Sequence, residues 1–256
     1  MNNLIILFDS LSAASLGCYG CNAKTPAFDM VAANGDLFTH CYSDFSGKLI
    51  EEYVNQFPTQ EMSEIETGIE VATSETQVIR IASKQNNQDL DELLQSSINH
   101  FTDGQDRDFN LVITALQGDF SKENSTKESQ FPGEMAVHVP LIISLAHQEM
   151  SRRRLDLLTS QHVVQILKSL TTSNEAYHRF RDSMDVKQIS YNTAKVLATR
   201  TRDWLHFREN HLDEHGESLQ QLFRKPEDVW EILDVADQYP RVIEHFQTSG
   251  DLTFPD

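Results

Sequence analysis

The chain has 256 residues, of which 39% are hydrophobic, so it is long enough for one large domain or for a main domain with a small appendage. Its 39 acidic residues against 21 basic ones give a formal net charge of −18. This balance argues against nucleic acid or an anionic membrane as a partner, because clustered Lys and Arg bind phosphate groups. The only dense basic run is the three arginines at 152–154, which we expect to form a solvated loop or helix start.

The sequence favours a cytoplasmic protein without a membrane partner. No segment reaches the roughly 18 apolar residues of a membrane span, and no charged stretch precedes an apolar one with a cleavage site. Three cysteines, an odd number, fit a reducing compartment better than a disulfide framework.

The first predicted element is a buried strand. Residues 4–8 form an apolar run that ends in Asp9 and Ser10, which is typical of a parallel sheet covered on both faces. Ligands collect outside the carboxyl ends of such strands, so Asp9 is a candidate site residue. The alternative is that Asp9 caps the helix or turn that follows.

Helical and extended segments then alternate, as a doubly wound sheet requires. Thr25 as N-cap and Pro26 as first helical residue predict a short helix, and residues 37–42 an extended segment. Residues 44–86 show no clear pattern apart from a strand at 76–83. Beyond them we expect a helix from an N-cap at Asp89 to residue 101 and a strand at 109–114.

The second half reads as a strand, a helix and a C-terminal region. The strand is predicted at 134–145, although it contains Pro140, which usually marks an edge, a strand start or a bulge. The remaining predictions are a helix at 161–170, an antiparallel hairpin with a long polar tip from 196 onward, and short helices at 226–235 and 240–246. We expect an α/β domain over residues 1–190, with residues 191–256 packed on it.

Several segments resemble the sulfatase family of the alkaline phosphatase superfamily. They are "NLIILFDSL" with "LGCYG" and "TPAFDMVAANGDLFTHCYS", then "NLVITALQGDF", "VHVPLIISL", and the C-terminal stretch from "VLATRTRDWLHFR" to "RVIEHF". Together they cover about half of the chain. The resemblance implies an α/β fold with a mixed, mostly parallel sheet, helices on both faces, and a small C-terminal antiparallel hairpin region, in a truncated and degenerate member.

The resemblance also implies where metal ligands should lie. Members of the family hydrolyse sulfate, phosphate or phosphonate esters with a divalent cation, usually calcium, which acids from two strand ends hold. Asp9 matches the first metal-binding Asp, and Ser10 stands where many members have a second one. Leu116 and Gln117 stand at the family's later Asp-His or Asp-Asn pair, but Leu offers no donor atom and Gln only one neutral oxygen.

The family's nucleophile motif, Cys or Ser followed by x-Pro-x-Arg, is missing after "FTHCYS", where the sequence continues "DFSGKLIEEYV". Lys127 can be compared with a family Lys, and His138 stands where relatives carry an Arg. Each lost charged ligand costs several kcal/mol of cation binding. The expectation is therefore a non-catalytic pseudoenzyme without a cofactor, in which Asp9 and Ser10 are remnants. We expect a binding or scaffolding role with a protein partner or by self-association, because the shortened fold should expose sheet edge and apolar surface.

The alternative is a sulfate or phosphate ester hydrolase that uses Ca²⁺ or another divalent cation. Its site would be rebuilt around Asp9 with Ser10, Asp119 or His138, or completed by a partner chain.

Three further motifs have a structural and a functional interpretation. Cys18 and Cys21 have the Cys-x-x-Cys spacing of redox proteins, but we favour a buried structural Cys18. Residues 211–215, "HLDEH", match a zinc-peptidase pattern, but we favour a solvated hairpin tip. In the predicted helix at 226–235 we expect the apolar face to pack on the domain rather than to bind a partner.

Overall fold

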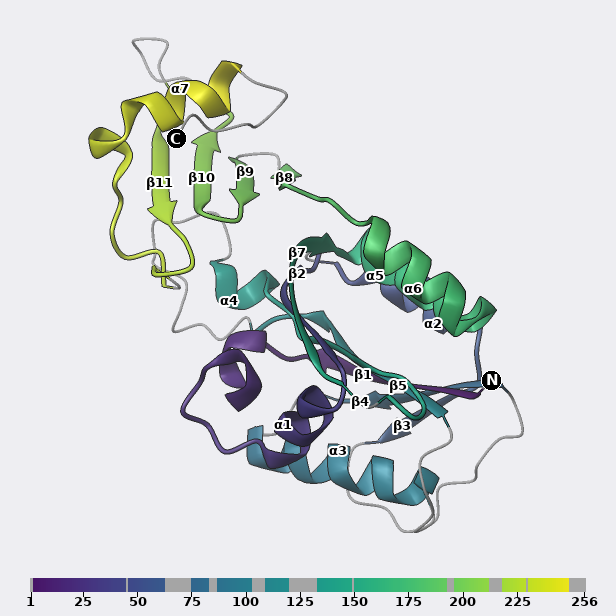
Figure 1. Cartoon of the computed structure of the whole chain (residues 1–256). Helices are drawn as coiled ribbons and strands as arrows, with labels where there is room; N and C mark the ends of the chain where they lie inside the picture. Colours follow the sequence, from purple (N-terminus) through teal and green to yellow (C-terminus); the bar gives the residue numbers. More distant parts are fainter. Residues whose placement is uncertain are drawn as a thin grey trace. The chain divides into compact units, whose positions relative to one another are not determined.

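The computed structural model describes residues 2–44, 46–62, 75–82, 87–102, 109–119, 133–148, 150–192, 196–211, 218–228 and 230–248. Two compact units make up the chain, one of Met1–Asp119 with Ala136–Met184 and the other of Phe120–Met135 with Asp185–Asp256. Figure 1 traces both units along the sequence.

The first unit contains a seven-stranded sheet in the order β3-β4-β1-β5-β6-β2-β7. Its strands are β1 (Asn2–Ser10), β2 (Asp36–Tyr42), β3 (Thr59–Met62), β4 (Thr76–Ile81), β5 (Phe109–Gln117), β6 (Leu141–Ser144) and β7 (Arg152–Thr159). Strand β6 runs antiparallel to β5 and β2, whereas the other neighbouring pairs are parallel. The predicted mixed, mostly parallel sheet is confirmed.

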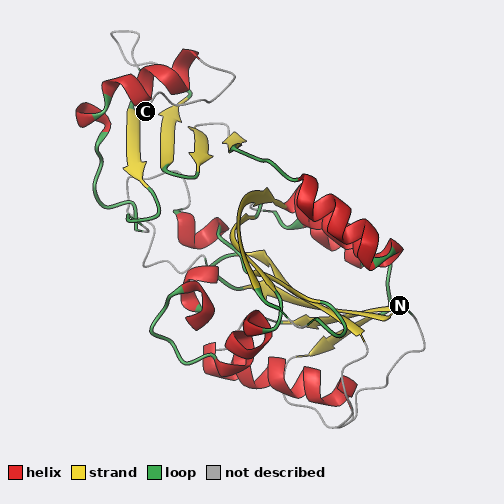
Figure 2. Cartoon of the chain, in the orientation of Figure 1, coloured by secondary structure: helices red, strands yellow, loops and turns green. Residues whose placement is uncertain are grey.

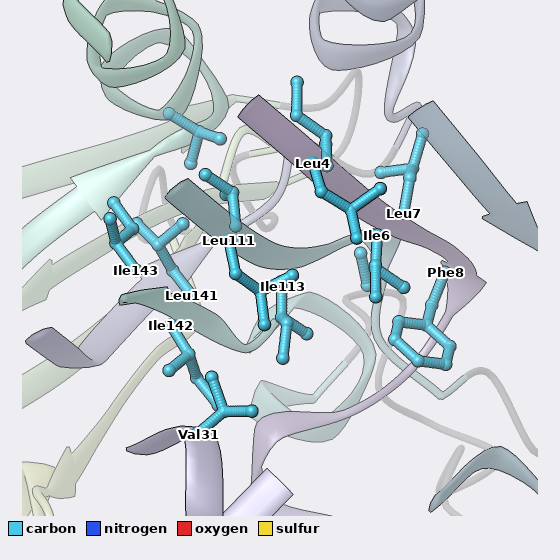
Figure 3. Close-up of a cluster of buried hydrophobic side chains, with 14 of the residues drawn as sticks. Leu4, Ile6, Leu7, Phe8, Val31, Leu111, Ile113, Leu141, Ile142 and Ile143 are labelled. Atoms are coloured by element: carbon cyan, nitrogen blue, oxygen red, sulfur yellow. The ribbon is translucent and has the colours of Figure 1, made fainter. Parts of the chain in front are cut away.

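Helices cover both faces of this sheet (Figure 2). One face carries α1 (Pro26–Ala33) and α3 (Asn87–Thr102); the other carries α2 (Lys48–Val54), α5 (Ser160–Thr172) and α6 (Asn174–Ser183). The double cover explains the uninterrupted apolar run of β1, in which residues 4–8 are at most 1% exposed. Figure 3 shows Leu4, Ile6 and Phe8 of β1 beside Leu111 and Ile113 of β5 in this core.

The second unit contains a four-stranded antiparallel sheet in the order β11-β10-β9-β8. Its strands are β8 (Gln188–Asn192), β9 (Val196–Thr201), β10 (Trp204–Glu209) and β11 (Gln220–Arg224), and the helix α7 (Pro240–Thr248) follows. The predicted hairpin is the β10/β11 pair, and α7 confirms the last predicted helix. The predicted polar tip of the hairpin, residues 212–217, lies outside the described residues.

One predicted element is only partly right and another is wrong. The strand expected at 134–145 begins instead as a short helix, α4 (Glu134–Val137), and only β6 is extended. Pro140 directly precedes β6, where its missing N–H removes no ladder bond. The helix expected at 226–235 does not form: the described residues there make turns and irregular chain, with Glu231 in a left-handed conformation (φ 50°) that a helix cannot contain.

Smaller corrections concern boundaries. Helix α3 begins at Asn87, so Asp89 lies in its first turn rather than at the N-cap. A negative charge in the first turn still interacts favourably with the helix dipole. The three arginines at 152–154 start strand β7 rather than a loop or helix. No described helix combines the length and hydrophobicity that a membrane span requires.

Candidate functional site

The site is built at the carboxyl end of β1, between β4 and β5. Strand β1 includes Asp9 and Ser10 as its last two residues, so both are held by the sheet rather than by a following loop. In the parallel β1/β4 ladder, Arg80 is in register with Leu7. Because alternate residues of a strand share a face, Asp9 and Arg80 project from the same side of the sheet.

The carboxylate of Asp9 forms an ion pair with the guanidinium of Arg80. Arg80 Nε lies 2.5 Å from Asp9 Oδ1, and Arg80 Nη1 lies 2.9 Å from Oε1 of Glu51, which helix α2 supplies. The three side chains are 26–35% exposed. The hydrogen bond to Asp9 is the largest of the effects that raise the pKa of Arg80, so the guanidinium stays charged.

The Ser10 hydroxyl is directed to the neighbouring strand. Its Oγ donates to the carbonyl oxygen of Gly118 at 2.5 Å, just beyond the end of β5. Next to it, the Leu11 N–H donates to Gln117 O at 2.9 Å. Both bonds extend the β1/β5 ladder past its end, which is a structural use of a hydroxyl at a strand end.

Leu116 is part of the packing beneath α2. It is 7% exposed, and the chain at Gly47, the residue before α2, passes directly over it. A Cβ on Gly47 would lie 2.7 Å from the Leu116 Cβ. The position that should carry a second metal ligand is therefore filled by an apolar side chain in close contact with the backbone.

No protein-family model matches the sequence, and no curated protein matches it. The structure, in contrast, is similar to solved sulfatases. A Bacteroides thetaiotaomicron protein of glycosaminoglycan metabolism superposes with a TM-score of 0.70 at 8% identity, over 95% of this chain and 94% of that one. A 2-O GAG sulfatase gives 0.66 at 10% identity over 96% and 90%, and a sulfatase from Pseudoalteromonas sp. gives 0.62 at 11% over 96% and 89%.

This chain has the sulfatase fold. At 8–11% identity the similarity establishes the fold alone, and it agrees with the resemblance of the N-terminal segments. What the sulfatase fold does in this chain depends on its own residues.

The residues at Asp9 do not fit the divalent cation that sulfatases use. Calcium takes six to eight oxygen ligands. Here one oxygen of Asp9 is bound to a guanidinium, and Leu116 brings no donor atom. Within the ranges that the structure describes, no group of three or more His, Cys, Asp and Glu could hold a metal ion.

His138 packs in an aromatic cluster with Tyr19 and Tyr42. Its ring stacks on Tyr42 with centroids 5.2 Å apart, meets Tyr19 edge to face at 5.9 Å, and its Nε2 lies 2.8 Å from Thr39 O. These contacts join β2 to the segment before β6. Asp119 is exposed beyond β5, and Lys127 lies outside the described residues.

Cys18 has the features of a structural thiol, although it is half-buried rather than buried as expected. Cys18 and Cys21 are free, and burial raises the pKa of Cys18 to about 12. A thiol with such a pKa is not a thiolate at neutral pH, so it is a poor nucleophile. Of the zinc-like motif, His211 is exposed after β10, and His215 lies outside the described residues.

Sequence reasoning missed Arg80 and Glu51. A signal for Arg80 exists: a charged residue in the apolar strand "TQVIRIAS" needs a carboxylate partner to be accommodated. Its partner could not be read from the sequence, because Asp9 lies 71 positions away from Arg80.

Proposed function

We propose that this protein is a pseudoenzyme of the sulfatase fold, which no longer hydrolyses esters and serves as a binding or scaffolding module in a protein complex. The observation that supports it is the guanidinium of Arg80 between Asp9 and Glu51. A fixed cation there neutralises the one carboxylate that matches a family metal ligand. A divalent cation brought to Asp9 would also be repelled, and two unit charges 4 Å apart interact by about 4 kcal/mol at an effective dielectric constant of 20.

The hydroxyl beside Asp9 supports the same conclusion. A hydrolytic Ser needs a base that accepts its proton or a cation that lowers its pKa. Ser10 instead donates a hydrogen bond to the backbone carbonyl of Gly118, which is not basic enough to remove the hydroxyl proton. Asp9 and Ser10 thus both take part in structural interactions.

The net charge and the free cysteines indicate the kind of partner and the compartment that we propose. A net charge of −18 favours a partner surface that is basic, and the free thiols fit the reducing cytoplasm.

The alternative is a metal-dependent sulfate or phosphate ester hydrolase with a rebuilt or partner-completed site at Asp9. It is favoured by the fact that two carboxylates, Asp9 and Glu51, meet at one cation position.

Calorimetry with Ca²⁺, Mg²⁺, Mn²⁺ and Zn²⁺, together with turnover of an aryl sulfate and an aryl phosphate, separates the two functions. The pseudoenzyme should show neither tight binding nor turnover, and its melting temperature should not change with Ca²⁺ or Mg²⁺. Asp9→Asn tests the site, and Asp185→Asn, at a 79% exposed carboxylate outside every candidate site, is the control. Tight metal binding with a rate that Asp9→Asn abolishes and Asp185→Asn preserves would establish the hydrolase instead.

A further inference from the structure

The segment after β11 presents three large apolar side chains to solvent. Trp230 is 58% exposed, Ile232 81% and Leu233 62%. We call these three residues the apolar tip. The sequence places Ile232 and Leu233 on a face expected to pack on the domain, and the structure contradicts this. Neighbouring exposed apolar side chains of this size are typical of an interaction surface.

Buried ionic contacts hold the tip in place. Glu231, in the middle of the tip, turns its carboxylate inward to Lys225 Nζ at 2.6 Å, and Lys225 is fully buried. Lys225 Nζ also lies 2.5 Å from Glu134 Oε2, and the Glu134 N–H donates to Glu231 at 3.2 Å. This arrangement fixes the left-handed backbone at Glu231 and directs its neighbours outward.

Hydrogen bonds to Asp228 order the C-terminal part of the tip. The carboxylate of Asp228 accepts the N–H groups of Ile232 and Leu233 at 3.0 and 2.9 Å. The apolar side chains are therefore held before any partner arrives, which lowers the entropic cost of binding.

The charges around the tip indicate what would bind it. Glu227, Asp234 and Asp237 are exposed on either side of the three apolar residues. A complementary surface needs exposed apolar side chains next to Lys or Arg. The acidic rim argues against an anionic lipid surface.

Such a surface exists on the chain itself, at the start of β7. Met150 is 66% exposed and Leu155 47%, and Arg152 and Arg153 between them are exposed on opposite faces of β7. We call these four residues the basic edge. Arg153 Nη2 also donates to Cys18 O at 2.8 Å. Strand β7 is the last strand of the described seven-stranded sheet, and an edge strand gains from being covered.

We propose that the apolar tip of one copy binds the basic edge of another copy, so that the chain self-associates through two different surfaces. The inference goes beyond the proposed function and holds whether or not Asp9 supports catalysis. Association combines burial of Trp230, Ile232 and Leu233 with pairing of Glu227 and Asp237 with Arg152 and Arg153. Because the two surfaces differ, the contact closes as a reciprocal pair or ring, or continues as a chain of copies.

Two charge-reversal variants test the pairing. Arg152→Glu with Arg153→Glu makes the edge acidic, and Glu227→Lys with Asp237→Lys makes the tip basic. Each variant alone then has like charges on both surfaces, and its association should weaken by about tenfold or more. In an equimolar mixture each surface again meets one of opposite charge, so association should return. Sedimentation velocity over a range of concentrations measures this, with circular dichroism and melting temperature as checks of folding.

The apolar contribution has its own test. Ile232→Ser should weaken self-association of the otherwise unchanged chain, whereas Leu219→Ser, at a 62% exposed leucine outside the tip, should not. These substitutions leave the buried ionic contacts intact, so folding should be preserved.

Each result supports or overturns the proposal. Self-association that each reversal weakens, that the mixture restores and that Ile232→Ser reduces supports it. A wild-type chain that stays monomeric overturns it, as does association that persists in both reversal variants. Variants that are monomeric alone and remain so when mixed would show that the tip and the edge do not pair. None of these outcomes depends on metal binding or turnover, which test the proposed function separately.

Discussion

At the scale of single residues, Arg80 has two partners and defines the candidate site. Its ion pairs with Asp9 and Glu51 involve side chains that are a quarter to a third exposed, so solvent screens them and they add little stability. Their effect on chemistry is larger, because the cation occupies the carboxylate that would have to bind a metal. A change at Arg80 should therefore affect ion binding more than folding.

Arg80→Gln should change the unfolding free energy by no more than about 1 kcal/mol and leave Asp9 and Glu51 without their cation. We expect affinity for divalent cations to rise above that of the wild type, measured by calorimetry with Ca²⁺ and Mn²⁺. Arg80→Lys keeps the charge and should behave like the wild type. Equal metal binding in all three proteins would contradict the view that Arg80 blocks the site.

At the scale of elements, the spacing of apolar residues and the residues that start and stop helices made most of the large sheet predictable. The apolar run of β1, the Thr25-Pro26 start of α1 and the apolar repeat of α3 are local signals, and local signals determine local structure. The failures at 134–145 and 226–235 have a common cause. Both segments are rich in apolar residues, but long-range contacts of Glu134 and Glu231 decide their backbone.

The junction between Gly47 and β5 allows a test at this scale. Gly47→Ala should destabilise the protein by about 1–3 kcal/mol, because φ is 63° and the new Cβ would meet Leu116. Gly20→Ala measures backbone strain without a new contact, since its Cβ would have no atom within 4 Å, and its φ of 102° is less favourable for Ala than 63°. Urea unfolding should show a loss for Gly47→Ala at least as large as for Gly20→Ala; a clearly smaller loss would mean that the contact with Leu116 has no energetic importance.

At the scale of the whole molecule, the chain forms two units with separate packing. The main hydrophobic cluster draws its members from the first unit, whereas the second unit has its own sheet and a buried ionic cluster around Lys225. Removing one member of a buried ionic cluster leaves its partners uncompensated, which typically costs several kcal/mol.

Lys225→Met should accordingly lower the stability of the second unit by about 3–5 kcal/mol and affect the first unit less. Native-state hydrogen exchange measures both at once: amides of β9 to β11 should exchange faster, and those of β1 and β5 should keep their protection. Lys187→Met, at a lysine that is 64% exposed, is the control. Equal acceleration in both units would show that they unfold as one.

The class of this protein could be predicted from its residues alone: a mostly parallel sheet covered by helices, an antiparallel C-terminal region, and the resemblance of its N-terminal segments to sulfatases. These follow from hydrophobic pattern and turn residues, which act between neighbours in the chain. The partner of Asp9 follows from the packing of the sheet, because Arg80 reaches it from β4 and no local pattern pairs residues 71 positions apart; Glu51 of α2 then pairs with the same guanidinium. The tertiary structure also decided that Trp230, Ile232 and Leu233 face solvent, because the buried contacts of Glu231 with Lys225 and Glu134 override the helical pattern of that segment.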